Sequence, residues 1–263
     1  MFELARYDAE KRVRGAAVLS GGIVALVAMY AWIWPNIESS TVDFDQYIEA
    51  FPPALREMFG IRSLGTIEGY LATELYAFVW VLLLGLYFAY AGAGLVASDV
   101  ERGRMDVLLA MPVSRARVVT EKLLALAVPL LAVNVVTPAA VYVSVVALGE
   151  SIAVADLVAV HALSVPYLLA CAGIGLLASV GASRVSVAQR AAMGVVFGLF
   201  LVESVAASTD YSWLGTLSPS RYYEPANVLV DSQYDVGGAL ALLAGAVALF
   251  LAGVWWFRRS DVA

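Results

Sequence analysis

The sequence is poor in the residue types that most enzymes use for chemistry. It has one cysteine, Cys171, one histidine, His161, and only two lysines among its 263 residues. A single cysteine cannot form an intrachain disulfide, and no group of cysteines and histidines has the spacing of metal ligands. The sequence therefore excludes an internal disulfide framework, and it argues against a metal site or a histidine-based catalytic triad.

Charge is also scarce. Charged residues make up 14% of the chain, whereas soluble domains carry about a quarter. Hydrophobic residues make up 62%, and the mean hydropathy is +0.82. This composition predicts an integral membrane protein. The length suits one helical bundle, so we expect a single transmembrane domain over residues 1–263.

The charge that is present is mostly acidic, with 22 acidic and 16 basic residues and a net charge of −6. A surface rich in carboxylates and poor in lysine suits a high-salt environment, where charges are strongly screened. This balance favours a halophilic archaeal host. A GC-rich genome, which favours arginine and alanine codons, would give the same composition, and the sequence does not separate the two explanations.

Six apolar stretches are long enough to cross a membrane. A span needs about 20 mostly apolar residues, and its backbone must satisfy its own hydrogen bonds, so each is predicted to be a helix. The first stretch is longer than the apolar region of a signal peptide and no A-x-A site follows it, so we expect it to remain in the protein. The expected spans are residues 15–34, 75–97, 123–148, 157–182, 191–208 and 236–257. The predicted fold is an all-α, six-helix membrane bundle.

Basic residues predict the orientation of these spans. With the N-terminus in the cytoplasm, the cytoplasmic segments hold 13 basic residues and the outer segments hold three, Arg56, Arg62 and Arg221. This split follows the positive-inside rule. Because the number of spans is even, both termini are predicted to be cytoplasmic, in a multi-pass protein of the plasma membrane.

Two predicted outer segments, residues 36–73 and 209–235, are long and rich in aromatic residues. In the first, apolar residues recur at helical spacing around residues 44–51. We expect short amphipathic helices at the outer membrane surface in both segments. For the second segment, an irregular aromatic loop fits the sequence equally well.

One stretch departs from the general scarcity of charge. Residues 98–122, SDVERGRMDVLLAMPVSRARVVTEK, hold nine of the 38 charged residues of the chain and lie between two apolar spans, on the predicted cytoplasmic side. A loop that only set the topology would need basic residues alone. The acidic residues, the glycine and the leucine pair therefore favour a folded segment that contacts a partner.

The same stretch predicts its own local structure. Residues 104–110 can form a short helix, with Gly103 providing a bend before it. Pro112 ends this helix, because the residue before a proline avoids the helical conformation. Ser114 can cap the next helix, which starts at Arg115 and runs into the third span. The apolar face that we expect to be open to a partner contains Val107, Leu108 and Leu109.

These residues resemble the intracellular loop of type-2 ABC transporter permeases. The family pattern has two acids, a glycine, a short leucine-rich helix, a proline, a serine or threonine, an arginine and, further on, a lysine. The matching residues are Asp99, Glu101, Gly103, 105–109, Pro112, Ser114, Arg115 and Lys122. The chain departs from the pattern at Arg104 and Met105, where the family usually has threonine and leucine.

The resemblance implies a permease subunit, of the exporter kind, with an N-terminal amphipathic helix and short outer helices. It also implies that the cytoplasmic helix docks in a cleft of a separate ATPase subunit and transmits ATP-driven closure to the spans. The implied coupling residues are Asp99, Glu101, Arg102, Gly103, Arg104, Met105, Asp106, Leu108, Leu109, Pro112, Ser114 and Arg115.

The chain has no G-x-x-x-x-G-K-[ST] motif for binding nucleotide phosphates. We therefore expect no catalytic site and no cofactor in this chain, with ATP and Mg²⁺ bound by the partner ATPase. The other expected partners are a second permease chain, in a homodimer or a heterodimer, and membrane lipid, with no nucleic acid. The sequence does not identify the substrate or the direction of transport.

Polar residues inside the expected spans suggest alternatives. Glu203 would be costly in a membrane unless it is paired or faces water, so it is a candidate for an ion-coupled secondary transporter. The other interpretation is a satisfied polar contact near the outer surface. Asn134 and Thr137 are candidate pathway residues, although such side chains more often join helices. His161 is interpreted as a contact at the membrane interface. A membrane enzyme or scaffold is a third possibility, but no convergent catalytic set supports it.

Overall fold

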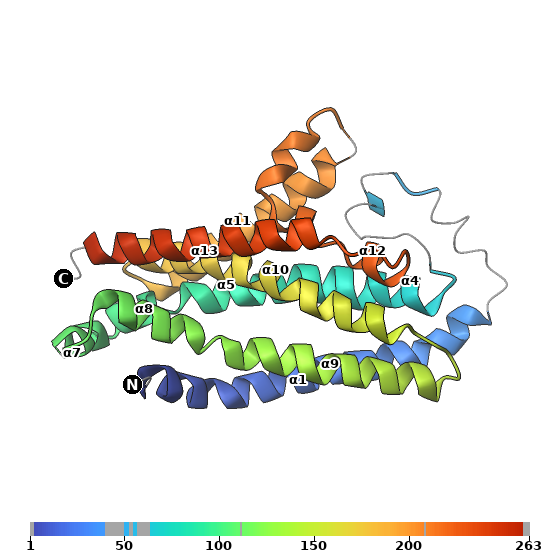
Figure 1. The fold of residues 1–263 in the computed structure, drawn as a ribbon, viewed down its shortest axis with the longest axis horizontal. Coiled ribbons are helices and arrows are strands. Elements are labelled where there is room, and N and C mark those ends of the chain that lie inside the picture. The colour runs from blue at the N-terminus through green and yellow to red at the C-terminus, as the bar shows by residue number, and fades with distance from the viewer. Residues whose placement is uncertain are drawn as a thin grey trace.

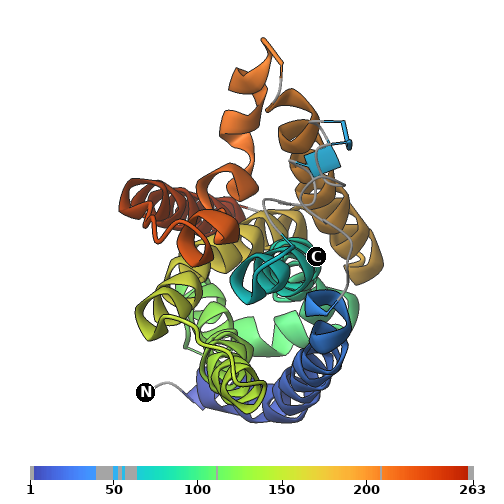
Figure 2. The ribbon, with the colours of Figure 1, turned by 90° about the vertical axis from the view of Figure 1, so that its right-hand side faces the viewer.

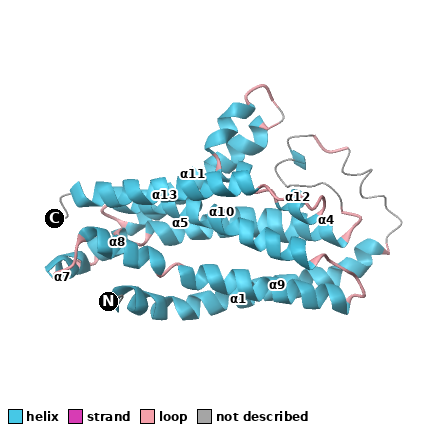
Figure 3. Ribbon diagram, in the orientation of Figure 1, coloured by secondary structure: helices cyan, strands magenta, loops and turns pink. Residues whose placement is uncertain are grey.

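The computed structural model describes residues 3–39, 50–52, 55–56, 64–110, 112–207 and 209–259. All regular structure in these ranges is helical, without strands, as Figure 1 and Figure 3 show. Six helical segments are long and apolar enough to span a membrane: Glu3–Glu38, Ile67–Ala93, Arg115–Ala147, Val154–Gly181, Val185–Ala206 and Val236–Arg259. The predicted all-α membrane bundle is confirmed.

The central helix of the bundle is α10 (Val154–Gly181). It packs along α13 (Val236–Arg259) on one side and α5 (Gly85–Ala93) on another. A second layer pairs α1 (Glu3–Glu38) with α9 (Ala127–Ala147), and Figure 1 shows this pair running beneath the rest of the bundle. The helix α1 is continuous and contains both the N-terminal segment and the first span.

The second span begins earlier in the chain than the sequence predicts. It consists of α4 (Ile67–Leu71), η1 (Ala72–Leu84), which is wound as a π-helix, and α5. Its first residue is set by Thr66, whose side-chain oxygen accepts a hydrogen bond from the Gly69 backbone N–H at 3.2 Å. This cap satisfies an otherwise unpaired donor of the first turn, so the helix starts eight residues before the expected position 75.

The third span is two helices rather than one. The first, α8 (Arg115–Leu124), is separated from α9 by a turn at Ala125 and Leu126. Pro129 lies four residues after Ala125, and in a continuous helix its ring would clash with the Ala125 carbonyl. At the other end, Gly149 has φ +80°, a left-handed conformation that commonly follows the last turn of a helix.

The fifth span, α11 (Val185–Ala206), begins six residues earlier than expected. The segment after it, for which short helices and an irregular loop were equally expected, contains three short helices: η2 (Ser212–Leu217), η3 (Pro219–Tyr222) and α12 (Pro225–Leu229). Two of them begin with proline, whose fixed φ suits a first helical position. Figure 1 shows the end of α11 and η2 projecting from the side of the bundle. The helix predicted around residues 44–51 lies almost entirely outside the described residues.

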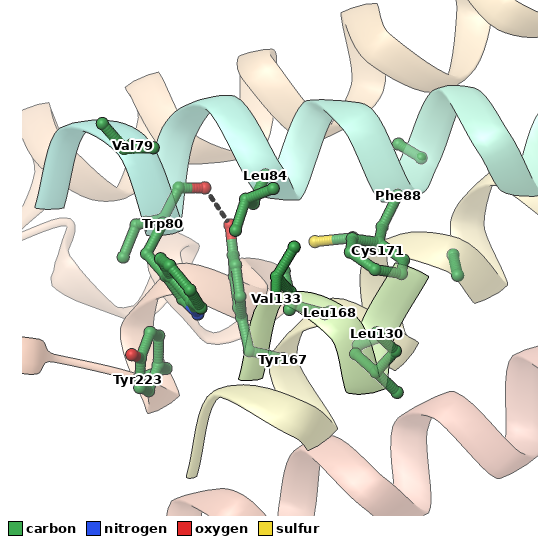
Figure 4. Close-up of a cluster of buried hydrophobic side chains, with 14 of the residues drawn as sticks. Val79, Trp80, Leu84, Phe88, Leu130, Val133, Tyr167, Leu168, Cys171 and Tyr223 are labelled. Atoms are coloured by element: carbon green, nitrogen blue, oxygen red, sulfur yellow. Dashed lines mark hydrogen bonds between the residues drawn. The ribbon is translucent and has the colours of Figure 1, made fainter. Parts of the chain in front are cut away.

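The core is built around α10 and the second span. Figure 4 shows Trp80, Tyr167 and Tyr223 together at one end of this cluster, with Phe88 and Cys171 at the other. The Tyr167 hydroxyl donates a hydrogen bond to the Val81 carbonyl at 2.6 Å, and its ring stacks on Tyr223 with the centroids 5.5 Å apart. The Tyr223 hydroxyl donates to the Val160 carbonyl at 3.0 Å, so both of these buried tyrosine hydroxyls are satisfied.

Candidate coupling site at the basic end of the bundle

The charged stretch forms three short helices at one end of the bundle. They are α6 (Ala97–Glu101), α7 (Arg104–Ala110) and the first turns of α8. Gly103 separates the first two with φ +65°, a left-handed conformation that glycine adopts without cost. The Ser114 side chain accepts a hydrogen bond from the Arg117 backbone N–H at 3.2 Å. The predicted bend, the bounds of the 104–110 helix and the serine cap are confirmed.

A buried ion network fixes this segment internally. Asp99 is 4% exposed, and its two carboxylate oxygens contact Arg104 and Lys122. The ammonium of Lys122, also buried, lies 3.2 Å from Asp8 near the start of α1. A buried charge is tolerated only when it is paired in this way. Asp99 and Lys122 together therefore join α6, α7, α8 and α1.

A second acid, Glu121, holds the N-terminus of α1. One of its oxygens accepts hydrogen bonds from the Leu4 and Ala5 backbone N–H groups, each at 3.1 Å. The other lies 2.6 Å from Arg117 one turn earlier on α8. The carboxylate satisfies unpaired donors of the first turn and faces the positive end of the helix dipole. Sequence reasoning missed this contact and the Asp8 pair, because both join residues more than 110 positions apart.

The segment is also attached to the remaining spans. Glu101 accepts a hydrogen bond from the Val185 backbone N–H at 2.9 Å, in the first turn of α11. Arg115 donates to the Phe257 carbonyl at 3.0 Å, in the last turns of α13. The Ser179 hydroxyl of α10 accepts hydrogen bonds from the Val96 and Ala97 backbone N–H groups, both at 2.9 Å. Side-chain contacts thus link the segment to four spans, which makes it mechanically continuous with the bundle.

The face of α7 that remains open differs from the expected one. Met105 is fully buried, and Leu108 and Leu109 are partly buried against the core. These three positions share one helical face by their spacing of three and four residues. Leu108 also borders a groove of about 470 Å³ that includes Leu4 of α1. The prediction that the leucine pair is open to a partner was therefore wrong in part.

The exposed surface of α7 is mixed in character. Its one large apolar side chain that is strongly exposed is Val107, at 67%, and Ala110 is exposed as well. Arg102, Arg104 and Asp106 around Val107 are also exposed. Within its described part, the stretch therefore presents Val107 in a ring of charges, while the buried and partly buried apolar residues of α7 hold this helix to the bundle.

The polar residues of the third and fourth spans meet inside the bundle. The Asn134 carbonyl oxygen lies 3.0 Å from the Ser164 hydroxyl and 3.3 Å from Nδ1 of His161. Nε2 of His161 lies 3.0 Å from the Tyr76 hydroxyl. This network joins α9, α10 and η1, which matches the interpretation of Asn134 as a helix-joining residue. The interpretation of His161 as an interface contact was wrong, because it is only 4% exposed.

The two other candidate pathway residues lie apart from this network. Thr137 is fully buried, and its hydroxyl has no hydrogen-bond partner among the described residues. Glu203 lies near the end of α11, with an oxygen 3.7 Å from Arg221 beside η3. A small cavity of about 100 Å³ separates this region from the second span. The Glu203 geometry matches a polar contact near the end of a span, and its role in transport stays a prediction.

Together, six membrane-length helices and a folded charged segment attached to four of them describe a multi-pass membrane protein of the permease class. The chain matches the model of the ABC-2 family transporter proteins over residues 4–262, so it belongs to this family. Membership makes the chain an ABC transporter permease, which is a membrane transport component. It also implies an ABC ATPase subunit as its partner. A comparison with curated proteins gives no match.

Proposed function

We propose that this chain is the permease subunit of an ATP-driven exporter, and that residues 98–122 couple it to a separate ATPase subunit. The ATPase would bind ATP and Mg²⁺, and the six spans would form the membrane pathway together with a second permease chain. The distribution of basic residues supports a cytoplasmic position for the charged segment, where such an ATPase would have access to it. The exporter direction rests on the family resemblance of this segment.

This proposal rests on one observation: the 98–122 segment is attached to the spans on one side and exposed on the other. Its buried residues Asp99, Met105 and Lys122 attach it to the spans, while Val107 and the surrounding charges face outward. A force applied to α7 would therefore pass into α1, α10, α11 and α13 through specific contacts. A segment that served only to set topology would need neither the buried ion network nor the Val185 contact.

The test is affinity purification of the chain from its native membrane with identification of the proteins that co-purify. We expect an ABC ATPase subunit with the wild-type chain. Val107→Asp should reduce its recovery at least about tenfold, because a charge buried in an apolar contact costs more than the 1.4 kcal/mol that corresponds to this factor. ATP hydrolysis coupled to transport should fall in parallel.

The matched control is Ser186→Asp, which adds the same charge to an exposed position in the first turn of α11, outside the 98–122 segment. It should leave recovery of the ATPase unchanged. Absence of an ATPase with the wild-type chain, or equal recovery with Val107→Asp, would show that the segment does not dock it. Leu108→Ala is less informative, since this residue also packs against the permease core.

A further inference from the structure

A long apolar groove runs along the outside of the bundle. It has a volume of about 770 Å³ and lies between α11 and α13, with α10 as its floor. Figure 2, which looks along the bundle, shows α11 and α13 on either side of α10. Small or aliphatic residues line it, among them Ala178, Ala191, Val195, Leu242 and Gly245. We call it the α11–α13 groove.

The dimensions of the α11–α13 groove fit flexible hydrocarbon. It extends along α13 from Ala241 to Trp256, which is about 22 Å at 1.5 Å per residue. Acyl chains are long and flexible, so they can follow a groove of this length that small and aliphatic side chains line.

The two ends of the α11–α13 groove differ in chemistry. Thr216, Ser218 and Tyr222 of the outer segment close one end. At the other end, two arginines share a helical face with lining residues: Arg184 lies three and four positions before Val187 and Ala188, and Arg259 lies three positions after Trp256. Both arginines are exposed, and neither forms an ion pair within the described part of the chain.

The surroundings of this basic end strengthen its positive charge. Arg259 lies 4.2 Å from the centroid of the Trp255 ring, and Arg258 adds a third cation beside it. Tryptophan and arginine together are typical of a membrane interface. Glu101 also lies at this end, where it accepts a hydrogen bond from the Val185 backbone N–H. Basic pockets between spans on the cytoplasmic side bind anionic headgroups.

We propose that the α11–α13 groove binds an anionic phospholipid. Its acyl chains lie in the groove, and its phosphate lies at the basic end near Arg184 and Arg259. The lipid comes from the leaflet that faces this end, which is the cytoplasmic leaflet in the predicted orientation. This site is separate from residues 98–122 and does not depend on the identity of the transported substrate.

The experiment uses the full chain in phosphatidylcholine vesicles with a small fraction of a phosphatidylglycerol probe that carries a diazirine in one acyl chain. After irradiation, the modified residues are identified by peptide mass spectrometry. We expect modification concentrated on the groove-lining residues of α10, α11 and α13. The same probe with a phosphatidylcholine headgroup should modify them at least about fivefold less, since each arginine near a surface attracts an anionic headgroup by roughly this factor.

Two pairs of variants separate the groove from the charge. Gly245→Phe should fill the groove and remove the modification, because a side chain at this position meets no atom within 4 Å. The matched control is Gly194→Phe, which is equally open but lies outside the groove. Arg184→Gln combined with Arg259→Gln should abolish the preference for phosphatidylglycerol, whereas Arg190→Gln, exposed elsewhere on α11, should keep it.

Modification spread evenly over all lipid-facing helices and unchanged by Gly245→Phe would overturn the proposal. Equal modification by the two headgroups would overturn the role of the arginines. A second chain in the groove is the remaining alternative. Efficient disulfide crosslinking between two copies of a Val195→Cys variant would establish it and would also reject the lipid site.

Discussion

At the scale of single residues, the charged side chains of residues 98–122 act mainly inside this chain. Asp99 and Lys122 are both nearly buried, and each has two oppositely charged neighbours. Glu121 and Glu101 bind backbone N–H groups at the N-termini of α1 and α11. The nine charges in this stretch are therefore explained more by how the segment is attached to the spans than by its docking surface.

Asp99→Asn should destabilise the protein, because it leaves Lys122 buried with only Asp8 as an ionic partner. We expect a loss of about 3 kcal/mol, the lower part of the range for a broken buried pair. This corresponds to a decrease in Tm of about 5–10 °C for the purified protein in detergent. Asp106→Asn, at an exposed position on α7, is the control and should leave Tm unchanged. Equal melting temperatures would show that the Asp99 pairs do not stabilise the fold.

At the scale of elements, the contact between α5 and α10 depends on two glycines. Gly92 faces the Ala172 carbonyl of α10, and Gly175 faces the Ala89 carbonyl of α5. In both places a Cβ atom would collide with backbone that cannot move without displacing a whole helix. Small residues at such points allow helices to approach closely in a membrane, where packing provides most of the association energy.

Gly175→Leu should therefore separate α5 from α10 and cost about 3 kcal/mol, the upper part of the usual range for overpacking. Gly21→Leu is the matched control, because a side chain there meets no atom within 4 Å. The amount of folded protein that elutes as a single peak in size-exclusion chromatography, together with its Tm, provides the measurement. Similar values for the two variants would contradict the close approach of these helices.

At the scale of the whole molecule, α1 begins and α13 ends at the end of the bundle where α7 lies, and α4 and α12 lie at the opposite end (Figure 1). This arrangement agrees with an even number of spans. The direction in which the bundle crosses the membrane rests on the distribution of basic residues, and it can be measured directly.

Impermeant thiol reagents should label Gln233→Cys in intact cells and should not label Asp106→Cys, because the positive-inside rule places these positions on opposite sides. The native Cys171 is fully buried and provides an internal background control. Both variants should react after the membrane is permeabilised. Labelling of position 106 from outside would reverse the predicted topology.

From the family resemblance we expect two permease chains and two ATPase subunits in the assembly, with the pathway at an interface of two-fold symmetry, the commonest symmetry of oligomers. Native mass spectrometry of the complex purified in mild detergent should report two copies of the 27.9 kDa chain. A transport-active complex with a single copy would reject this prediction. A second permease chain of different mass would indicate a heterodimer.

Much of the local structure could be predicted from the sequence, because it depends on neighbouring residues. The apolar runs required six helices, and Gly103, Pro112 and Ser114 set the bounds of the short helix at residues 104–110 through their backbone preferences. The charged stretch also indicated the family. The predicted helix starts were less accurate where a capping residue such as Thr66 lay outside the apolar run, because hydropathy contains no information about capping.

Only the tertiary structure decided which way each side chain of these elements faces. The sequence placed Val107, Leu108 and Leu109 on one open face, whereas packing against the core partly buried the leucine pair and left Val107 exposed. The pairs of Glu121 with the start of α1 and of Lys122 with Asp8 depend on how α1 and α8 pack, which no local pattern encodes. The same holds for the α11–α13 groove, whose walls come from three spans. Helices form from local preferences, but the environment of a residue depends on which distant helix reaches it.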